Sequence, residues 1–199
     1  MKKFPWFYFF FVLIWIIAII PLFIYTLEPT IWTLRTLSRY TGMVGFALVY
    51  LSLMGAYIKE WQYHQTNKPF MTSHHLLVIP AWILMLVHPT VLAIQWSNWG
   101  IFIPNNFDTL MNFLRFGGKV ALIIFTIGVI AVALRKVLKG WKIIHMFQLI
   151  AFLLAGIHAW IIGTDTQSIG VRILLVLMMG SASALFFYNR KRFKYVLKK

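Results

Sequence analysis

Long apolar stretches separated by short polar segments dominate this sequence of 199 residues. Each stretch is about 20 residues long, the length that an α-helix needs to cross the roughly 30 Å hydrocarbon layer of a bilayer. Hydrophobic residues make up 61% of the chain and charged residues 12%, and no soluble domain of this size needs so much apolar surface. The sequence therefore predicts an all-α membrane protein, a bundle of six transmembrane helices. The expected spans are about residues 4–25, 34–58, 70–94, 115–134, 143–162 and 169–188.

The basic residues indicate how the chain is oriented in the lipid bilayer. Lys and Arg number 19 against 4 Asp and Glu, a balance that would suggest nucleic acid in a soluble chain. Here they flank the apolar stretches, so we expect no nucleic-acid binding. With a cytoplasmic N-terminus, fourteen of them face the cytoplasm and five the opposite side, as the positive-inside rule predicts. We therefore expect a multi-pass cell-membrane protein with both termini in the cytoplasm. The five on the outer side are Arg35, Arg39, Arg115, Lys119 and Arg172.

The motifs that the sequence lacks narrow the chemistry. There is no cysteine, which excludes disulfides, thiolate-ligated iron–sulfur clusters and covalently attached c-type haem. No glycine-rich nucleotide-binding motif follows a predicted strand. The expectation is one transmembrane domain over residues 1–199, without a soluble nucleotide-binding domain of its own and with no catalytic residue.

Histidines occur in matched pairs inside two of the predicted spans. His75 and His88 are 13 residues apart in one span, and His145 and His158 are 13 residues apart in another. On a helix this spacing is a rise of roughly 20 Å, so each span carries one imidazole near either membrane face. Ionisable side chains at membrane depth are costly and point to function. Two imidazoles are the axial ligands of a low-spin b-type haem iron. We therefore expect two b haems, an outer one on His88 and His158 and an inner one on His145 with His75 or His74.

Other readings of these histidines are open. A lone intramembrane histidine is more often an interhelical hydrogen-bonding group, and several together would serve a proton relay. Two matched pairs at equal depth favour haem ligation. Between the neighbouring candidates, 14 residues return to nearly the same helix face, which favours His74 with His88. His75 and His88 have the same spacing, and so the same axial rise, as His145 and His158, which favours His75. A kink at Pro80 would change the direction in which the His75 side chain points. We select His75 as the inner ligand.

Three short motifs carry a resemblance to a known family. Residues 38–42, Ser-Arg-Tyr-Thr-Gly, are similar to the Arg-x-x-Gly start of the second helix in the ferric reductase-like transmembrane family. The stretch from His75 to His88-Pro89 resembles the third helix of that family, and Trp141 to His145 with His158 resembles the fifth. The resemblance spans about residues 36–188. Members of the ferric reductase-like family include the membrane domains of NADPH oxidases and ferric reductases, and the haem-binding subunit of the bacterial methionine sulfoxide reductase system.

The resemblance implies a six-helix di-haem cytochrome b that carries electrons outward across the membrane. The donor would be a cytoplasmic flavin/NAD(P)H reductase partner or a membrane quinol, with FAD present only through that partner. The acceptor would be ferric iron, oxygen, a flavin or an extracytoplasmic partner reductase. For any single outer cation, contact with lipid headgroups is the more common explanation. Arg39 is selected because it lies in the family-like motif, and it is expected to neutralise the outer haem propionates or attract an anionic acceptor. The alternatives are a sulfoxide reductase subunit, and a haem-free transporter or proton channel that uses the histidines.

Overall fold

The computed structural model describes residues 33–196 except 58, 60–62, 65–68 and 106. The described residues form helices and loops and contain no strand, as the sequence predicts. The span expected at residues 4–25 lies outside the described residues. Four described helical stretches are long and apolar enough to cross a membrane, which is the mark of a membrane protein. These stretches are Leu34–Ala56, Phe70–Gln95, Trp141–Ile162 and Ile169–Tyr188.

The helix boundaries follow the predicted spans closely, with one exception. The long helices are α2 (Leu34–Tyr57), α4 (Phe70–Gln95), α6 (Gly117–Ala133), α8 (Gln148–Ile162) and α9 (Ile169–Val196). Short helices join them: η1 (Trp99–Phe102), α5 (Leu110–Arg115), α7 (Trp141–Met146) and η2 (Thr164–Gln167).

The exception is the stretch predicted at residues 115–134. There α5 ends at Arg115, Phe116 interrupts the helix, and α6 has 17 residues. At 1.5 Å per residue α6 rises about 25 Å, the lower end of the length that spans a bilayer. It is an apolar helix that is shorter than the four membrane-length stretches.

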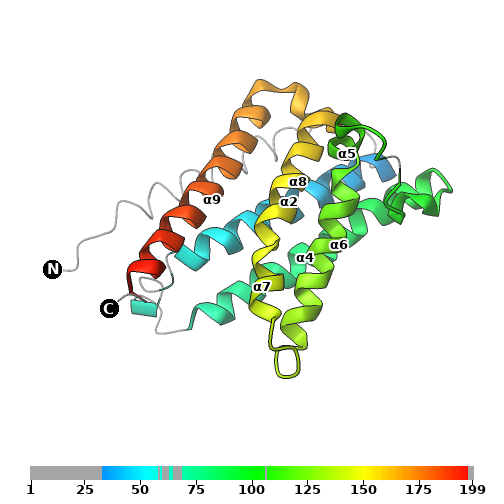
Figure 1. Ribbon diagram of the computed structural model, residues 1–199. Coiled ribbons are helices and arrows are strands. Elements are labelled where there is room, and N and C mark those ends of the chain that lie inside the picture. The colour runs from blue at the N-terminus through cyan, green and yellow to red at the C-terminus, as the bar shows by residue number, and fades with distance from the viewer. Residues whose placement is uncertain (1–32, 58, 60–62, 65–68, 106, 197–199) are drawn as a thin grey trace. The chain divides into compact units, whose positions relative to one another are not determined.

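The helices pack in two pairs. Helix α2 lies along α4, and α6 lies along α8, while α9 contacts both α8 and α2 (Figure 1). Among the described residues, α4 and α8 share no extended contact. Helices α4 and α8 are thus held in place mainly through other helices.

The centre of the bundle is closed by aromatic stacking between α2 and α8 and by contacts of both helices with α9. The rings of Phe46 and Phe152 stack with their centroids 4.5 Å apart, and Phe152 is almost completely buried. Tyr50 adds a hydrogen bond of 3.0 Å between its hydroxyl and that of Ser181 on α9. Gly156 lets α9 approach, because a β-carbon there would lie 3.0 Å from Cγ of Met179.

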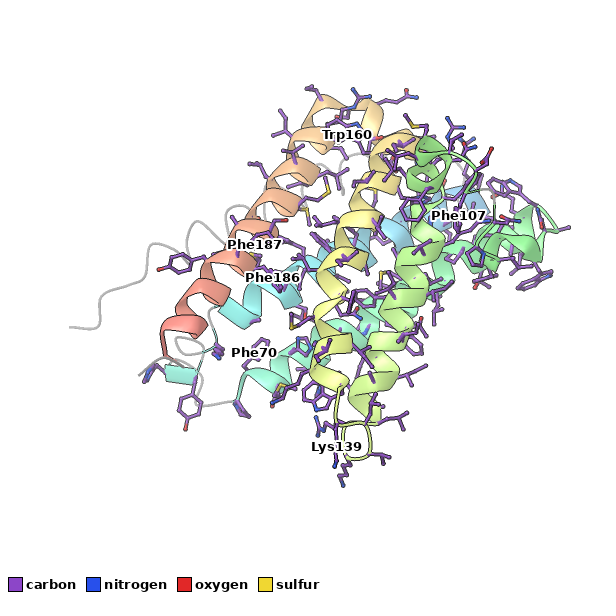
Figure 2. The ribbon with its side chains drawn as sticks, in the orientation of Figure 1. Phe70, Phe107, Lys139, Trp160, Phe186 and Phe187 are labelled. Carbon is purple, nitrogen blue, oxygen red and sulfur yellow. The ribbon has the colours of Figure 1, made fainter. Side chains whose placement is uncertain are left out.

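The outward faces of the helices are apolar. Large hydrophobic side chains point outward along α4, α6 and α9, and Leu76 remains 71% exposed. Such faces are stable when lipid covers them, so their exposure fits the membrane character of the helices. Figure 2 shows Lys139 and Trp160 at opposite ends of the α7–α8 pair. We call the Lys139 end the inner end of the bundle and the Trp160 end the outer end, after the predicted orientation.

Candidate metal centre

The five histidines of α4, α7 and α8 fall at two levels of the bundle. His74, His75 and His145 lie near the inner end, where α4 begins and α7 ends. His88 and His158 lie near the outer end, beside the start of α2 and the end of α5 respectively. The remaining histidine, His64, is exposed and lies outside the long helices.

Each outer imidazole is held by a backbone carbonyl of a neighbouring helix. Nδ1 of His88 lies 2.7 Å from the carbonyl oxygen of Ser38 on α2, and Nδ1 of His158 lies 2.7 Å from that of Arg115. The Ser38 hydroxyl also donates to the carbonyl oxygen of His88 at 3.0 Å. A carbonyl only accepts, so Nδ1 carries the proton in both rings and Nε2 keeps its lone pair. This is the tautomer in which histidine ligates a metal through Nε2.

Two glycines make room for the outer rings. A β-carbon at Gly42 would lie 2.8 Å from Nδ1 of His88, and one at Gly118 would lie 2.7 Å from Nε2 of His158. At Gly118, Nε2, Cδ2 and Cε1 are all 2.7–2.9 Å from that position. Because these distances are nearly equal, the glycine covers the face of the ring rather than its Nε2 tip.

At the inner end, the structure brings His74 beside His145. Their ring centroids are 6.0 Å apart with the planes 80° from each other. The buried hydroxyl of Ser52 on α2 lies 2.7 Å from Nδ1 of His74. Imidazole–metal bonds of about 2 Å put two opposed ligand nitrogens roughly 4 Å apart, and the ring centres roughly 2 Å further. The two imidazoles are therefore close enough that they would be able to hold one haem iron between them.

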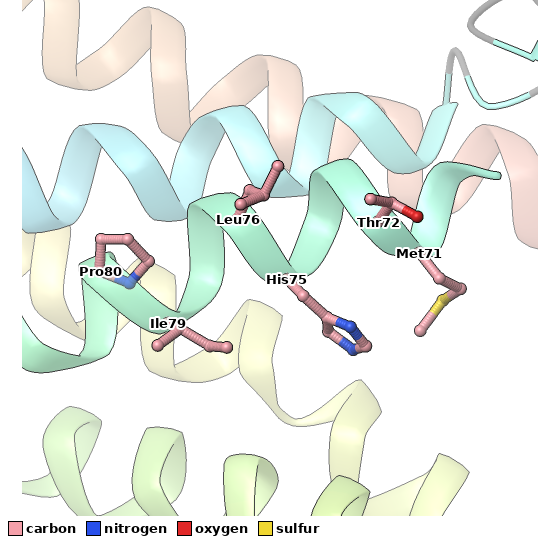
Figure 3. Close-up of a pocket in the computed structure, with 6 residues that line it drawn as sticks. All are labelled: Met71, Thr72, His75, Leu76, Ile79 and Pro80. Carbon is pink, nitrogen blue, oxygen red and sulfur yellow. The ribbon is translucent and has the colours of Figure 1, made fainter. Parts of the chain in front are cut away.

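His75 points to a different surface of α4. It lines a groove of about 500 Å³ (Figure 3). Its selection as the inner ligand stays a prediction, and the ring contacts favour the alternative, His74. The other residues that line the groove are Met71, Thr72, Leu76, Ile79 and Pro80.

Three of the five outer cations have partners within the protein. Arg39 forms an ion pair with Asp165 through two of its guanidinium nitrogens. Nζ of Lys119 lies 3.0 Å from both the carbonyl oxygen of Ile103 and the side-chain oxygen of Asn105. The guanidinium of Arg172 stacks 5.5 Å from the Trp160 ring centroid. The expected role of Arg39 beside haem propionates stays a prediction.

The donor set fits a porphyrin-bound iron better than a bare ion. Among the described residues, no three or more His, Cys, Asp or Glu side chains are grouped so that they could hold a metal ion. A haem iron needs only two axial ligands from the protein, because the porphyrin supplies the others. The two imidazole pairs, with free Nε2 atoms in the outer pair, meet that need.

No protein-family model matches this sequence, and neither a curated protein nor a solved structure matches it. The resemblance to ferric reductase-like domains accordingly stays a prediction based on the short motifs.

Two polar residues that surround the histidines were absent from the sequence prediction. Ser52 contacts His74, and the buried Gln148 follows His145 by one helical turn. A signal for both exists in the sequence, because each is a polar residue inside an apolar stretch and must find a hydrogen-bonding partner.

Proposed function

We propose that this chain is a six-helix membrane cytochrome b that binds two b-type haems and transfers electrons across the membrane. The observation that carries the proposal is the arrangement of imidazole pairs at two levels of an apolar bundle. In the outer pair, both Nδ1 atoms are committed to backbone carbonyls and both Nε2 atoms keep a lone pair. Bound haem would supply a one-electron couple at each level.

The protein's own residues hold and shield the sites. His88 and His158 are the proposed outer ligands, and His145 with His74 are the inner ones, with His75 as the alternative to His74. Ser38 and Arg115 orient the outer rings through their carbonyls, and Ser52 orients His74. The apolar helices around them exclude water and ions, which suits passage of electrons alone.

Electron input requires a partner in this proposal. The described residues contain no strand, and hence no sheet that could bind a nicotinamide or flavin nucleotide. We propose a cytoplasmic flavin reductase or a membrane quinol as donor, and an extracytoplasmic acceptor such as ferric iron, oxygen, a flavin or a partner reductase.

Absorbance tests the haem proposal. Protein purified from haem-replete cells should show b-type bands with two haems per chain by the pyridine haemochrome assay. Replacing His88 or His158 by Ala should remove the outer haem and leave one, because a bis-imidazole site loses an axial ligand. Replacing His145 by Ala should remove the inner haem. A colourless protein that conducts protons would instead establish the relay alternative.

The neighbouring histidines give a sharper test of the inner site. His74→Ala should lose the inner haem, since its ring faces His145, whereas His75→Ala should keep both haems. The two variants are matched controls for each other, because both remove one imidazole at the same depth of α4. Loss of haem in His75→Ala alone would assign the ligand to His75.

A further inference from the structure

Gln148 is a buried amide whose nitrogen makes a hydrogen bond and whose oxygen makes none with the residues that the structure describes. It begins α8, and 7% of its surface is exposed. Its Nε2 donates to the carbonyl oxygen of Ile124 on α6 at 3.0 Å. Gly128 of α6 lies directly against the amide, where any β-carbon would collide with it. Among the described residues, the amide oxygen Oε1 has no hydrogen-bonding partner.

His145, one turn earlier, also has a buried polar atom without a hydrogen-bonding partner in the described part of the chain. Its Nδ1 is buried and has no hydrogen-bonding partner among the described residues. The Nδ1 atoms of His74, His88 and His158 all have an oxygen within hydrogen-bonding distance. Within the part of the chain that the structure describes, His145 therefore has a buried ring nitrogen without a partner, and Gln148 has a buried acceptor without a donor. A proton on Nδ1 would let the two groups satisfy each other.

The backbone between them keeps the two side chains on one face. Phe147, which separates α7 from α8, has helical dihedral angles, φ −66° and ψ −8°. Its N–H bonds to the carbonyl oxygen of Ile144 at 3.1 Å, so the chain continues as a helical turn. Side chains three residues apart on a helix are neighbours and reach each other.

We propose that Gln148 is a positioning residue for His145, and that its amide oxygen accepts the Nδ1–H of the imidazole directly or across one water molecule. The hydrogen bond from Nε2 to Ile124 fixes which end of the amide faces away from α6, so the oxygen is the group available to the ring. The interaction places the His145 proton on Nδ1 and leaves Nε2 as the ligand atom. The role toward iron rests on the proposed function, but the choice of tautomer does not.

The tautomer is measurable in the full chain prepared without haem. In ¹⁵N-histidine-labelled protein at mildly alkaline pH, where imidazole is neutral, nitrogen shifts distinguish Nδ1–H from Nε2–H. We expect His145 to be Nδ1–H in the unmodified protein, and Gln148→Leu to move it toward Nε2–H. Gln148→Glu keeps an acceptor and should keep Nδ1–H. His158 is the internal control, because the Arg115 carbonyl holds its proton in every variant.

The haem-loaded protein gives a second readout. Acceptance of the Nδ1–H raises the basicity of a ligating imidazole and stabilises the oxidised iron. Gln148→Leu should therefore raise the midpoint potential of one haem, Gln148→Glu should lower it, and the other haem should not change. A purely structural role would shift both variants in the same direction.

The outcomes separate the two proposals. An unchanged His145 tautomer in Gln148→Leu overturns the role of Gln148 and leaves the haem proposal standing. A changed tautomer in a chain that never takes up haem keeps the positioning role and overturns the proposed function. If Gln148→Leu fails to fold, Gln148→Glu carries the test. The midpoint potential of one haem should then be lower than in the unmodified protein, and unchanged potentials at both haems contradict the inference.

Discussion

At the scale of single residues, the outer histidine rings fit into the bundle because the residues beside them are glycines. Gly42 and Gly118 carry no side chain, and the imidazoles of His88 and His158 occupy the space that one would fill. Glycine in a helix costs roughly 1 kcal/mol of stability relative to alanine. Its use at these two positions is explained by the close approach of the rings.

Gly42→Ala tests this explanation. The new methyl group would lie 2.8 Å from Nδ1 of His88, so the ring must move and the outer haem site is distorted. We expect a loss of about 1–3 kcal/mol in stability from overpacking and reduced occupancy of one haem, measured by thermal denaturation and haem content. Gly180→Ala is the matched control, because nothing lies within 4 Å of its β-carbon. Equal behaviour of the two variants would contradict the proposed crowding.

The limits of sequence reasoning are also clearest at single residues. The spacing of the histidine pairs was sufficient to propose two levels of imidazole. It left open whether His74 or His75 faces His145, because facing depends on how α4 is rotated against α2, where Ser52 contacts His74. Tertiary packing sets that rotation and the spacing of the histidines does not report it, so the selection of His75 stays a prediction.

At the scale of elements, an ion pair fastens the outer start of α2 to the loop between α8 and α9. Arg39 of α2 and Asp165 of η2 are joined through two nitrogens and both carboxylate oxygens. The Thr166 hydroxyl donates to the carbonyl oxygens at the end of α8, including that of Trp160 at 3.2 Å. The loop is thereby fixed against two helices, and no haem is needed to explain the position of Arg39.

A double-mutant cycle measures this ion pair. Arg39→Met and Asp165→Asn should each lower the thermal stability, and the double variant should lose less than the sum of the two. We expect a coupling free energy of about 1 kcal/mol, since the Arg39 side chain is 32% exposed and water screens part of the attraction. Haem content should stay at two in Asp165→Asn. Loss of the outer haem in Arg39→Met but not in Asp165→Asn would support the predicted contact with the propionates.

The positions of the helices were largely predictable, because hydropathy averaged over a stretch of about 20 residues reports burial in lipid. The expected spans at 34–58 and 70–94 agree with α2 and α4 to within one residue at each end. The prediction for residues 115–134 was less accurate because the helix is interrupted locally. Thr109 caps α5 by accepting from the Asn112 N–H at 3.1 Å, so a separate short helix forms before α6.

At the scale of the whole molecule, the proposal implies that nicotinamide alone is not a donor. The sequence contains no glycine-rich nucleotide-binding motif, so purified protein mixed with NADH or NADPH should show no haem reduction on a catalytic timescale. Addition of a flavin reductase or a quinol should reduce the inner haem first, because the cytoplasmic side is its nearest entry. Stopped-flow absorbance at the haem bands measures both reactions. Rapid reduction by NADH alone would contradict the requirement for a partner.

The inner loop between α6 and α7 offers a surface for an acidic donor. Lys136, Lys139 and Lys142 are all exposed there, and Lys139 lies at the tip of the inner end (Figure 2). Positive-inside topology explains such charges without any partner, so their presence alone does not establish docking. A docking role adds a kinetic consequence, because opposite charges accelerate the encounter of the two proteins. Salt at 0.1 M largely screens exposed charges that are more than about 10 Å apart, so it should slow that encounter.

Reduction by a flavin reductase partner should therefore slow as ionic strength rises. Replacing Lys136 and Lys139 together by Glu should slow it on the order of ten-fold at low salt, and the difference should vanish at high salt. Arg35→Glu is the control, since it reverses an exposed charge at the outer start of α2, away from the proposed dock. Reduction by a quinol, which enters from the lipid, should be indifferent to all these changes. A partner-driven rate that does not respond to salt would remove the docking role from this loop and leave its charges explained by topology.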